Sequence, residues 1–180
     1  MGKVHDDIGP ELRAFLERQP MFFVATAPLA SDGRVNVSPK GLEGTFAVLD
    51  EHRVAYLDLT GSGVETIAHL RENGRITIMC CAFEGPPRIV RLSGTGTVTT
   101  CDDDGFAELA DRFTAHPGAR AVVTVDVERV ADSCGYGVPH MEHRGHRDRL
   151  TKWAASRGDD GLAAYRAERN AKSIDGLPGF

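Results

Sequence analysis

The stretch 54–75, VAYLDLTGSGVETIAHLRENGR, decides the fold of this chain. It predicts a strand over residues 54–59, a turn over residues 60–63 and a helix over residues 64–73. A glycine-flanked turn that leads into a helix exposes backbone N–H groups at the positive end of the helix dipole. Two interpretations of this turn therefore stay open, a phosphate-binding site and an ordinary helix start.

Both ends of the predicted helix carry recognisable signals. Ser62 and Glu65 have the spacing of a capping box, in which the hydroxyl accepts from a helical N–H and the carboxylate accepts from the N–H of the cap residue. Gly74 stands where a left-handed residue commonly ends a helix. His69, within the helix, is expected at the surface or at an interface.

The composition fits one globular domain with an appended segment. The chain has 180 residues, of which 41% are hydrophobic, and a formal net charge of −5. This length allows a substantial core, and the acidic balance argues against nucleic acid and anionic membranes as partners. The sequence contains no apolar run long enough to span a membrane and no signal-peptide core, so we expect a cytoplasmic protein.

The cysteine and histidine patterns do not indicate a metal centre. The four cysteines include the adjacent pair Cys80 and Cys81, whose side chains would point to opposite faces of a strand, and no CxxC motif occurs. His140, His143 and His146 form an H-x-x-H-x-x-H run, but the glycines and the proline around it predict a loop. We therefore expect these histidines in a solvent-exposed loop.

The rest of the first 130 residues predicts an antiparallel β-fold. Apolar or alternating runs bounded by turn residues predict strands at 21–27, 34–40, 45–50, 53–59, 75–83, 88–100 and 120–130. Helices are expected at 7–19 and 102–116, and Gly94 and Gly96 should mark a bend or bulge in their strand. Because the connections are short, the strands should pair as hairpins in a barrel rather than in a parallel sheet, which needs long crossovers.

The C-terminal part of the chain differs in kind. After a loop, residues 147–172 have the pattern of a charged helix interrupted at 158–161, with Trp153 as an apolar anchor. Basic and acidic side chains are mixed along it, which favours a solvated face over a nucleic-acid surface. We therefore expect a barrel domain at 1–132 and, at 133–180, an extension that packs on the barrel or on a partner subunit.

The order of these motifs resembles a known family. The runs FFVATA (22–27), NVSPKG (36–41), RITIMCCAF (75–83) and RIVRLSGTGTV (88–98), together with the stretch 54–75, are similar to the pyridoxamine 5′-phosphate oxidase-related flavin-binding split β-barrels. SCGYGVPHMEH and SIDGLPGF extend the resemblance to the tail. The resemblance implies a mainly β fold with flanking helices, a six- to seven-stranded antiparallel split barrel and a helical C-terminal tail. It also implies a homodimer that binds FMN in clefts at the subunit interface, with relatives that use the deazaflavin F420 or haem instead.

The resemblance places the cofactor-binding residues at strand ends and on the turn before the helix. They are Lys40, Leu57, Asp58, Thr60, Ser62, Thr66, Arg88 and Arg91. The lysine and the two arginines would complement a phosphate or the ring carbonyls, and the three hydroxyl side chains would donate hydrogen bonds. Tyr136 and Trp153 are expected as walls of the cleft, and no catalytic residue is assigned.

Two positions depart from the family pattern. Glu65 and Thr66 stand where the family has an Arg-Lys pair, and Ile89 stands where it has Gln. In addition, residues 173–180 lack the arginines with which the true oxidase grips its substrate phosphate. The expected function is an FMN- or F420-dependent oxidoreductase acting on an unidentified small molecule, and not the pyridoxamine phosphate oxidase itself. A non-catalytic cofactor-binding or sensing module is the alternative from another class, and haem binding is a third.

Overall fold

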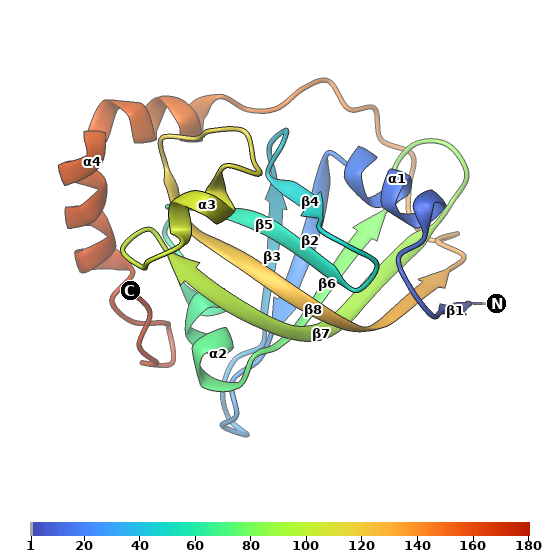
Figure 1. Cartoon of the computed structure of the whole chain (residues 1–180), viewed down its shortest axis with the longest axis horizontal. Helices are drawn as coiled ribbons and strands as arrows, with labels where there is room; N and C mark the ends of the chain where they lie inside the picture. Colours follow the sequence, from blue (N-terminus) through green and yellow to red (C-terminus); the bar gives the residue numbers. More distant parts are fainter. Residues whose placement is uncertain (1) are drawn as a thin grey trace.

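A single curled antiparallel sheet forms the centre of the molecule in the computed structural model, which describes residues 2–180 (Figure 1). Seven strands follow one another in the order β3-β2-β6-β7-β8-β5-β4, and the short β1 pairs with β8 outside this path. The strands are β1 (Val4–His5), β2 (Met21–Thr26), β3 (Asn36–Gly41), β4 (Phe46–Val48), β5 (Arg53–Leu59), β6 (Arg75–Cys81), β7 (Ile89–Thr100) and β8 (Ala119–Ser133). The predicted mainly β, antiparallel fold is confirmed.

The sheet curls most along its two longest strands, β7 and β8. Their pairing shifts register between Ser93 and Gly94, which is the bulge that the glycines predict. A Cβ atom at Gly94 would lie 2.0 Å from the backbone oxygen of Asp126, so only glycine allows the two strands to approach this closely. The bulge therefore helps to bend the sheet into a half-barrel.

Helix α1 (Pro10–Arg18) closes one end of the half-barrel. Pro10 begins the helix, where a missing N–H costs nothing, and Leu12, Phe15 and Leu16 form its buried face. These side chains join the main core cluster beside Phe22 and other apolar residues of the sheet. Helix α1 thus supplies a large part of the apolar surface that the barrel needs to be stable.

Helix α2 (Glu65–Asn73) packs against β2, β6 and β7 and ends as predicted. Gly74 has φ +71°, and its N–H donates to the Leu70 carbonyl. The expectation of a surface or interface position for His69 is wrong, because its side chain is fully buried and its Nδ1 lies 3.0 Å from the Thr26 hydroxyl. Burial lowers the pKa of His69, so the imidazole is neutral at pH 7.

The helix predicted at 102–116 is much shorter in the structure. Helix α3 covers only Phe106–Ala110. The Asp103 carboxylate accepts hydrogen bonds from the backbone N–H and the hydroxyl of Thr100, so it closes a turn at the end of β7 instead of capping a helix. Gly105 follows with φ +85°, which interrupts helical geometry before α3 begins.

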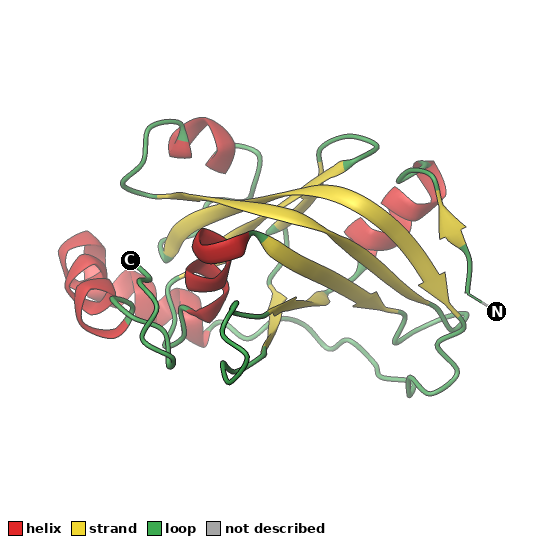
Figure 2. Ribbon diagram, turned by 90° about the horizontal axis from the view of Figure 1, so that it is seen from below, coloured by secondary structure: helices red, strands yellow, loops and turns green. Residues whose placement is uncertain are grey.

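The C-terminal part crosses the molecule before it becomes helical. Residues 134–148, which we call the strap, run along one side of the sheet from the end of β8 to α4 (Arg149–Arg169) (Figures 1 and 2). Helix α4 contains one non-helical residue, Gly158, with φ +63° and ψ 177°, at the predicted interruption. Across the described residues 2–180, no helix combines the length and the apolar character needed to cross a membrane.

Candidate functional site

A buried carboxylate connects three strands at one end of the half-barrel. Asp58, near the end of β5, is fully buried, and its Oδ1 lies 2.6 Å from the Lys40 Nζ on β3. Its Oδ2 lies 2.7 Å from the Arg120 Nε at the start of β8. Burial alone would raise the pKa of Asp58, but the two cations together hold this pKa below its ordinary value. Asp58 is therefore an anion that already has two cationic partners.

Arg120 extends this network to the end of the chain. Its Nη1 donates to the Asn170 side-chain oxygen at 2.8 Å, and its Nη2 donates to the Gly63 carbonyl at 2.8 Å. The Asn170 amide donates in turn to the Gly61 carbonyl at 3.0 Å. Arg120 and Asn170 thus fasten the residue after α4 to the turn that precedes α2.

The turn before α2 is occupied by groups of the chain itself. The predicted capping box is wrong for Ser62, because the residue that caps the helix is Val64, whose side chain accepts no hydrogen bond. The Glu65 carboxylate accepts from the Val64 N–H at 3.0 Å and from the Ile174 N–H at 3.2 Å. Gly179 packs so closely on Val64 that an added Cβ would lie 2.8 Å or less from both valine methyl groups. The C-terminal segment, residues 170–180, therefore lies over the start of α2.

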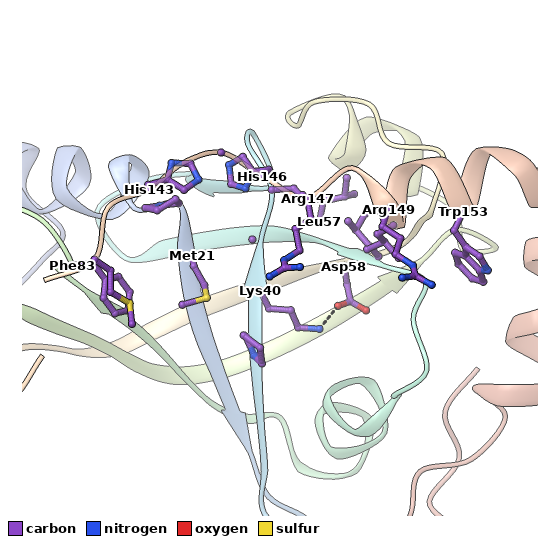
Figure 3. Close-up of a pocket in the computed structure, with 18 of the residues that line it drawn as sticks. Met21, Lys40, Leu57, Asp58, Phe83, His143, His146, Arg147, Arg149 and Trp153 are labelled. Carbon is purple, nitrogen blue, oxygen red and sulfur yellow. Dashed lines mark hydrogen bonds and ion pairs between the residues drawn. The ribbon is translucent and has the colours of Figure 1, made fainter. Parts of the chain in front are cut away.

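A large cavity opens between the sheet and the strap. It has a volume of about 830 Å³, within the range of small-molecule sites. Its floor is formed by the adjoining ends of β2, β3 and β5, and its cover by the strap and the first turns of α4 (Figure 3). The apolar part of the lining comes mainly from Pro20, Met21, Pro39, Leu42, Leu57, Leu59, Phe83, Met141, Leu150 and Trp153. The arrangement can hold a flat, largely apolar molecule away from water.

The strap is held over this cavity by two hydrogen bonds near its middle. The Met141 N–H donates to the Phe83 carbonyl at 3.0 Å, and the His143 N–H donates to the Glu84 carboxylate at 3.0 Å. His143 and His146 both line the cavity, and their rings meet edge to face with centroids 4.8 Å apart (Figure 3). Within residues 2–180 there is no group of three or more side chains arranged to hold a metal ion.

The charged side chains of the cavity are mainly basic. Lys40 reaches it from β3, and Arg147 and Arg149 reach it from the end of the strap and the start of α4 (Figure 3). Asp58 also lines the cavity and is paired with Lys40, while Glu142 pairs with Arg144 at 3.5 Å. Neither Arg147 nor Arg149 forms an ion pair with any residue in the described range 2–180. The cavity therefore combines apolar walls with two uncompensated guanidinium groups.

The structure brings together only some of the residues expected to bind a cofactor. Lys40, Leu57 and Asp58 line the cavity, as does Trp153, which was expected as a wall. Tyr136, also expected as a wall, is 83% exposed and does not line it.

The expected hydroxyl donors lie around the turn and the start of α2. Thr60 is buried with its hydroxyl unpaired, whereas Ser62 is exposed. The Thr66 hydroxyl accepts from the Asn36 amide at 3.0 Å. None of the three lines the cavity, so their role in cofactor binding stays a prediction.

The two arginines of β7 and its preceding turn are placed away from the cavity. Arg88 pairs with Glu11 at 2.9 Å and with Asp132 at 3.1 Å, and it also lies over the Phe15 ring. Arg91 donates to the Ser133 hydroxyl at 3.1 Å. Neither side chain lines the cavity of its own chain, so a role for them in cofactor binding also stays a prediction.

Sequence reasoning missed two arginines of the cavity, one at the end of the strap and one at the start of α4. Arg147 and Arg149 lie two residues apart in a segment whose pattern predicts a loop followed by a charged helix. Nothing in that pattern shows which charges face the barrel. The one available signal was the proximity of both arginines to Trp153, an aromatic anchor of the same segment.

Comparison with known proteins agrees with this architecture. The family model described as pyridoxamine 5′-phosphate oxidase matches residues 8–134. The Aspergillus flavus protein described as pyridoxamine 5′-phosphate oxidase family protein ustO is 42% identical over 195 residues, which cover 98% of this chain and 77% of the relative.

Solved structures show the same fold at lower identity. A variant of HupZ from Group A Streptococcus superposes with a TM-score of 0.55 at 24% identity, covering 70% of this chain and 99% of that one. An FAD-binding protein from Mesorhizobium loti gives a TM-score of 0.51 at 17% identity, covering 73% and 96%. With the family match over most of the chain and the close curated relative, the chain belongs to the pyridoxamine 5′-phosphate oxidase family.

Proposed function

We propose that this protein is a flavin- or deazaflavin-dependent oxidoreductase that acts on a small molecule. The observation that carries the proposal is the cavity of about 830 Å³, with apolar walls and basic side chains, in a member of this family. FMN is the first choice of cofactor and F420 the second. Structures of the same fold from Mesorhizobium loti and Mycobacterium smegmatis are described as FAD-binding proteins, which supports a flavin.

The residues of the cavity fit one part of a flavin well. Met21, Leu57 and Phe83 offer apolar surface to a flat ring, and the strap covers that surface from solvent. A bound flavin would supply hydride-transfer chemistry, while the chain would hold the ring, orient the substrate and exclude water. The start of α2, which the family resemblance suggests for the phosphate, fits less well because Glu65 and the C-terminal segment occupy it.

That poor fit favours one alternative, a binding or sensing module without catalysis. A chain that fills the start of α2 with its own carboxylate adds like-charge repulsion to any phosphate placed there. The family fold would then be kept for ligand binding alone. The two functions differ in whether a bound cofactor is reduced and reoxidised.

Spectroscopy of the purified protein tests the proposal. A yellow protein, or binding of FMN or F420 with a micromolar dissociation constant, supports it, and reduction of the bound cofactor by a hydride donor supports catalysis. A colourless protein that binds neither cofactor contradicts it. Binding without any redox turnover of the cofactor supports the non-catalytic alternative, and a Soret band after haem addition supports haem binding.

We also propose that the protein works as a homodimer in the cytoplasm. Val37 lies on β3, at the outer edge of the sheet, and Val35 directly precedes this strand. They are 62% and 70% exposed, which supports a second copy of the chain as the group that covers them. The four cysteines are free thiols, which supports a reducing compartment. In such a dimer, the cavity would lie beside the partner subunit.

A further inference from the structure

We propose that Arg147, which faces Lys40 across the cavity, and Arg149, which lines the cavity nearer to Trp153, bind the anionic group of the ligand, a phosphate or a carboxylate. This assignment rests on the proposed function, because it takes the cavity as the ligand site. It differs from the expectation of a phosphate at the start of α2. It also identifies the class of ligand as a flat, apolar body with an anion at one end.

The start of α2 already holds an anion of the protein itself, the Glu65 carboxylate. The Glu65 carboxylate accepts the Val64 N–H, and the carbonyls of Gly61 and Gly63 accept from Asn170 and Arg120. A phosphate at this turn would have to displace an internal anion and its hydrogen bonds. Nothing in these contacts leaves a free cation for it.

The cavity is lined by both acidic and basic side chains. Both of its carboxylates have cationic partners, Asp58 with Lys40 and Glu142 with Arg144. Arg147 and Arg149 have none within residues 2–180, although the whole chain carries a net charge of −5. Both guanidinium groups are exposed beside apolar walls, where a ligand anion can reach them and balance their charge.

The strap and the start of α4 carry the two arginines to the cavity. Figure 3 shows the Arg147 side chain reaching from the strap into the cavity, toward the strand that carries Lys40, and the Arg149 side chain lying nearer to Trp153. The strap is fixed on one side by the hydrogen bonds of Met141 and His143, and on the other by the start of α4. Arg147 lies between these anchors and Arg149 begins α4, so the protein holds the backbone of both arginines at the cavity.

Guanidinium groups suit this task better than ammonium groups. The planar donors of arginine can form two parallel hydrogen bonds with a phosphate or a carboxylate, and such charge-assisted bonds are about twice as strong as neutral ones. Lys40 cannot take this role by itself, because its ammonium group already pairs with Asp58 at 2.6 Å. It can add long-range attraction from the opposite wall.

The experiment compares FMN with riboflavin, which has the same ring system without the phosphate. Binding to the full chain is measured by flavin fluorescence and by calorimetry for the wild type, Arg147→Gln and Arg149→Gln. We expect each variant to lower the affinity for FMN about 10- to 100-fold, the effect of losing one charge-assisted hydrogen bond. The affinity for riboflavin should change less than about twofold, since uncharged contacts are kept.

Two further variants serve as controls. Arg112→Gln removes an exposed arginine that does not line the cavity, so FMN binding should not change. Glu65→Gln removes the anion at the start of α2. If the phosphate were bound there, this variant would bind FMN more tightly, and that result would overturn the inference. Melting temperatures confirm that all variants are folded.

The outcomes separate this inference from the proposed function. Equal affinity of the wild type for FMN and riboflavin, or equal losses for both ligands in the arginine variants, overturns the anion site but leaves a flavin-binding cavity. If the wild type binds FMN, riboflavin and F420 not at all, the proposed function fails and the anion site fails with it. A selective loss of FMN binding in both arginine variants establishes the site.

Discussion

At the scale of single residues, Asp58 has the largest effect on the site. It is a fully buried carboxylate that pairs with two cations, and each cation also contributes to another part of the structure. Lys40 lines the cavity, and Arg120 holds the C-terminal segment through Asn170. A buried ion pair of this kind contributes little net stability compared with apolar packing, but removal of one partner leaves an uncompensated charge.

Asp58→Asn should therefore destabilise the protein strongly. We expect a loss of about 3–5 kcal/mol in the free energy of unfolding at pH 7, because Arg120 stays buried without its counter-ion. The loss is measured by urea denaturation, with circular dichroism as the probe of unfolding. The matched control is Asp50→Asn, which breaks an exposed pair with Arg53 at 2.8 Å and should cost at most about 1 kcal/mol. Similar losses in both variants would contradict the prediction.

The same variant gives a prediction for acid. The pKa of Asp58 in the folded protein lies below the value of about 3.9 for an unfolded chain. Its ionised form therefore stabilises the fold above that pH, and this contribution disappears as the pH falls through the folded pKa. Asp58→Asn removes this titrating group. The difference between wild type and variant in the free energy of unfolding should therefore become smaller as the pH falls from 7 toward 3. A difference that is constant between pH 7 and pH 3 would contradict this.

The residues of the site were only partly predictable from the sequence. Lys40 and Asp58 followed from the family resemblance, and the structure places them in contact. Arg120 and Asn170 did not, since 50 residues separate them and their contact depends on where α4 ends. Arg147 and Arg149 were missed for the same reason, because the path of the strap is set by tertiary packing and not by a local pattern.

At the scale of elements, helix ends show how local signals compete with tertiary contacts. Gly74 ends α2 in the left-handed conformation that its position predicts. Ser62 does not begin it, because the Arg120 and Asn170 side chains hold the carbonyls of Gly63 and Gly61 in a separate turn. A capping signal is thus reliable where nothing else binds the same backbone groups.

At the end of α2, the cost of the left-handed conformation can be separated from the cost of a tertiary contact. Gly74 and Gly85 have almost the same backbone angle, φ +71° and +72°, but an added Cβ would lie 2.9 Å from the Thr95 methyl group at Gly74 and meets nothing within 4 Å at Gly85. Alanine at either position should cost about 1–2 kcal/mol for the left-handed conformation. Gly74→Ala should cost about 1 kcal/mol more through overpacking. Thermal denaturation of both variants measures the difference, and equal losses would disprove the role of Thr95.

Other elements escaped prediction for simple reasons. Strand β1 has two residues, which is too short for any periodic pattern, and it exists only because β8 offers an edge. Helix α3 is five residues long because Asp103 and Gly105 favour a turn where the apolar spacing alone predicts a helix. The positions of the longer strands were predicted closely from their apolar runs. Burial of a strand requires apolar side chains, and the pleat determines which of them share a face.

At the scale of the whole molecule, the open sheet edge at β3 predicts how two copies assemble. Val37→Asp should weaken the proposed dimer at least about tenfold, or 1.4 kcal/mol, because a charge would be buried in the interface. Val4→Asp is the matched control, since Val4 is also an exposed valine on an outer strand, at 57% against 62%. Light scattering after gel filtration gives the mass of each variant. A monomeric wild type, or a dimer that survives Val37→Asp, would contradict the assembly.

The predicted boundary between the barrel domain and the C-terminal extension lies after residue 132. The last strand of the sheet ends at Ser133, and the strap and α4 follow it. Residues on both sides of this boundary line the cavity. Separate domains at 1–132 and 133–180 stay a prediction, but the site needs both.

The link between Arg120 and Asn170 also fixes an order of events during synthesis. A ribosome adds about 5–20 residues per second, so the 50 residues that separate these two partners take roughly 3–10 s to make. The sheet strands are complete only once Ser133 has been added, and from then until Asn170 is made the guanidinium group of Arg120 has only water in place of the asparagine. The nascent protein is therefore a half-barrel with a hydrated charge at its open end. That charge is sealed from water when the residues after α4 arrive.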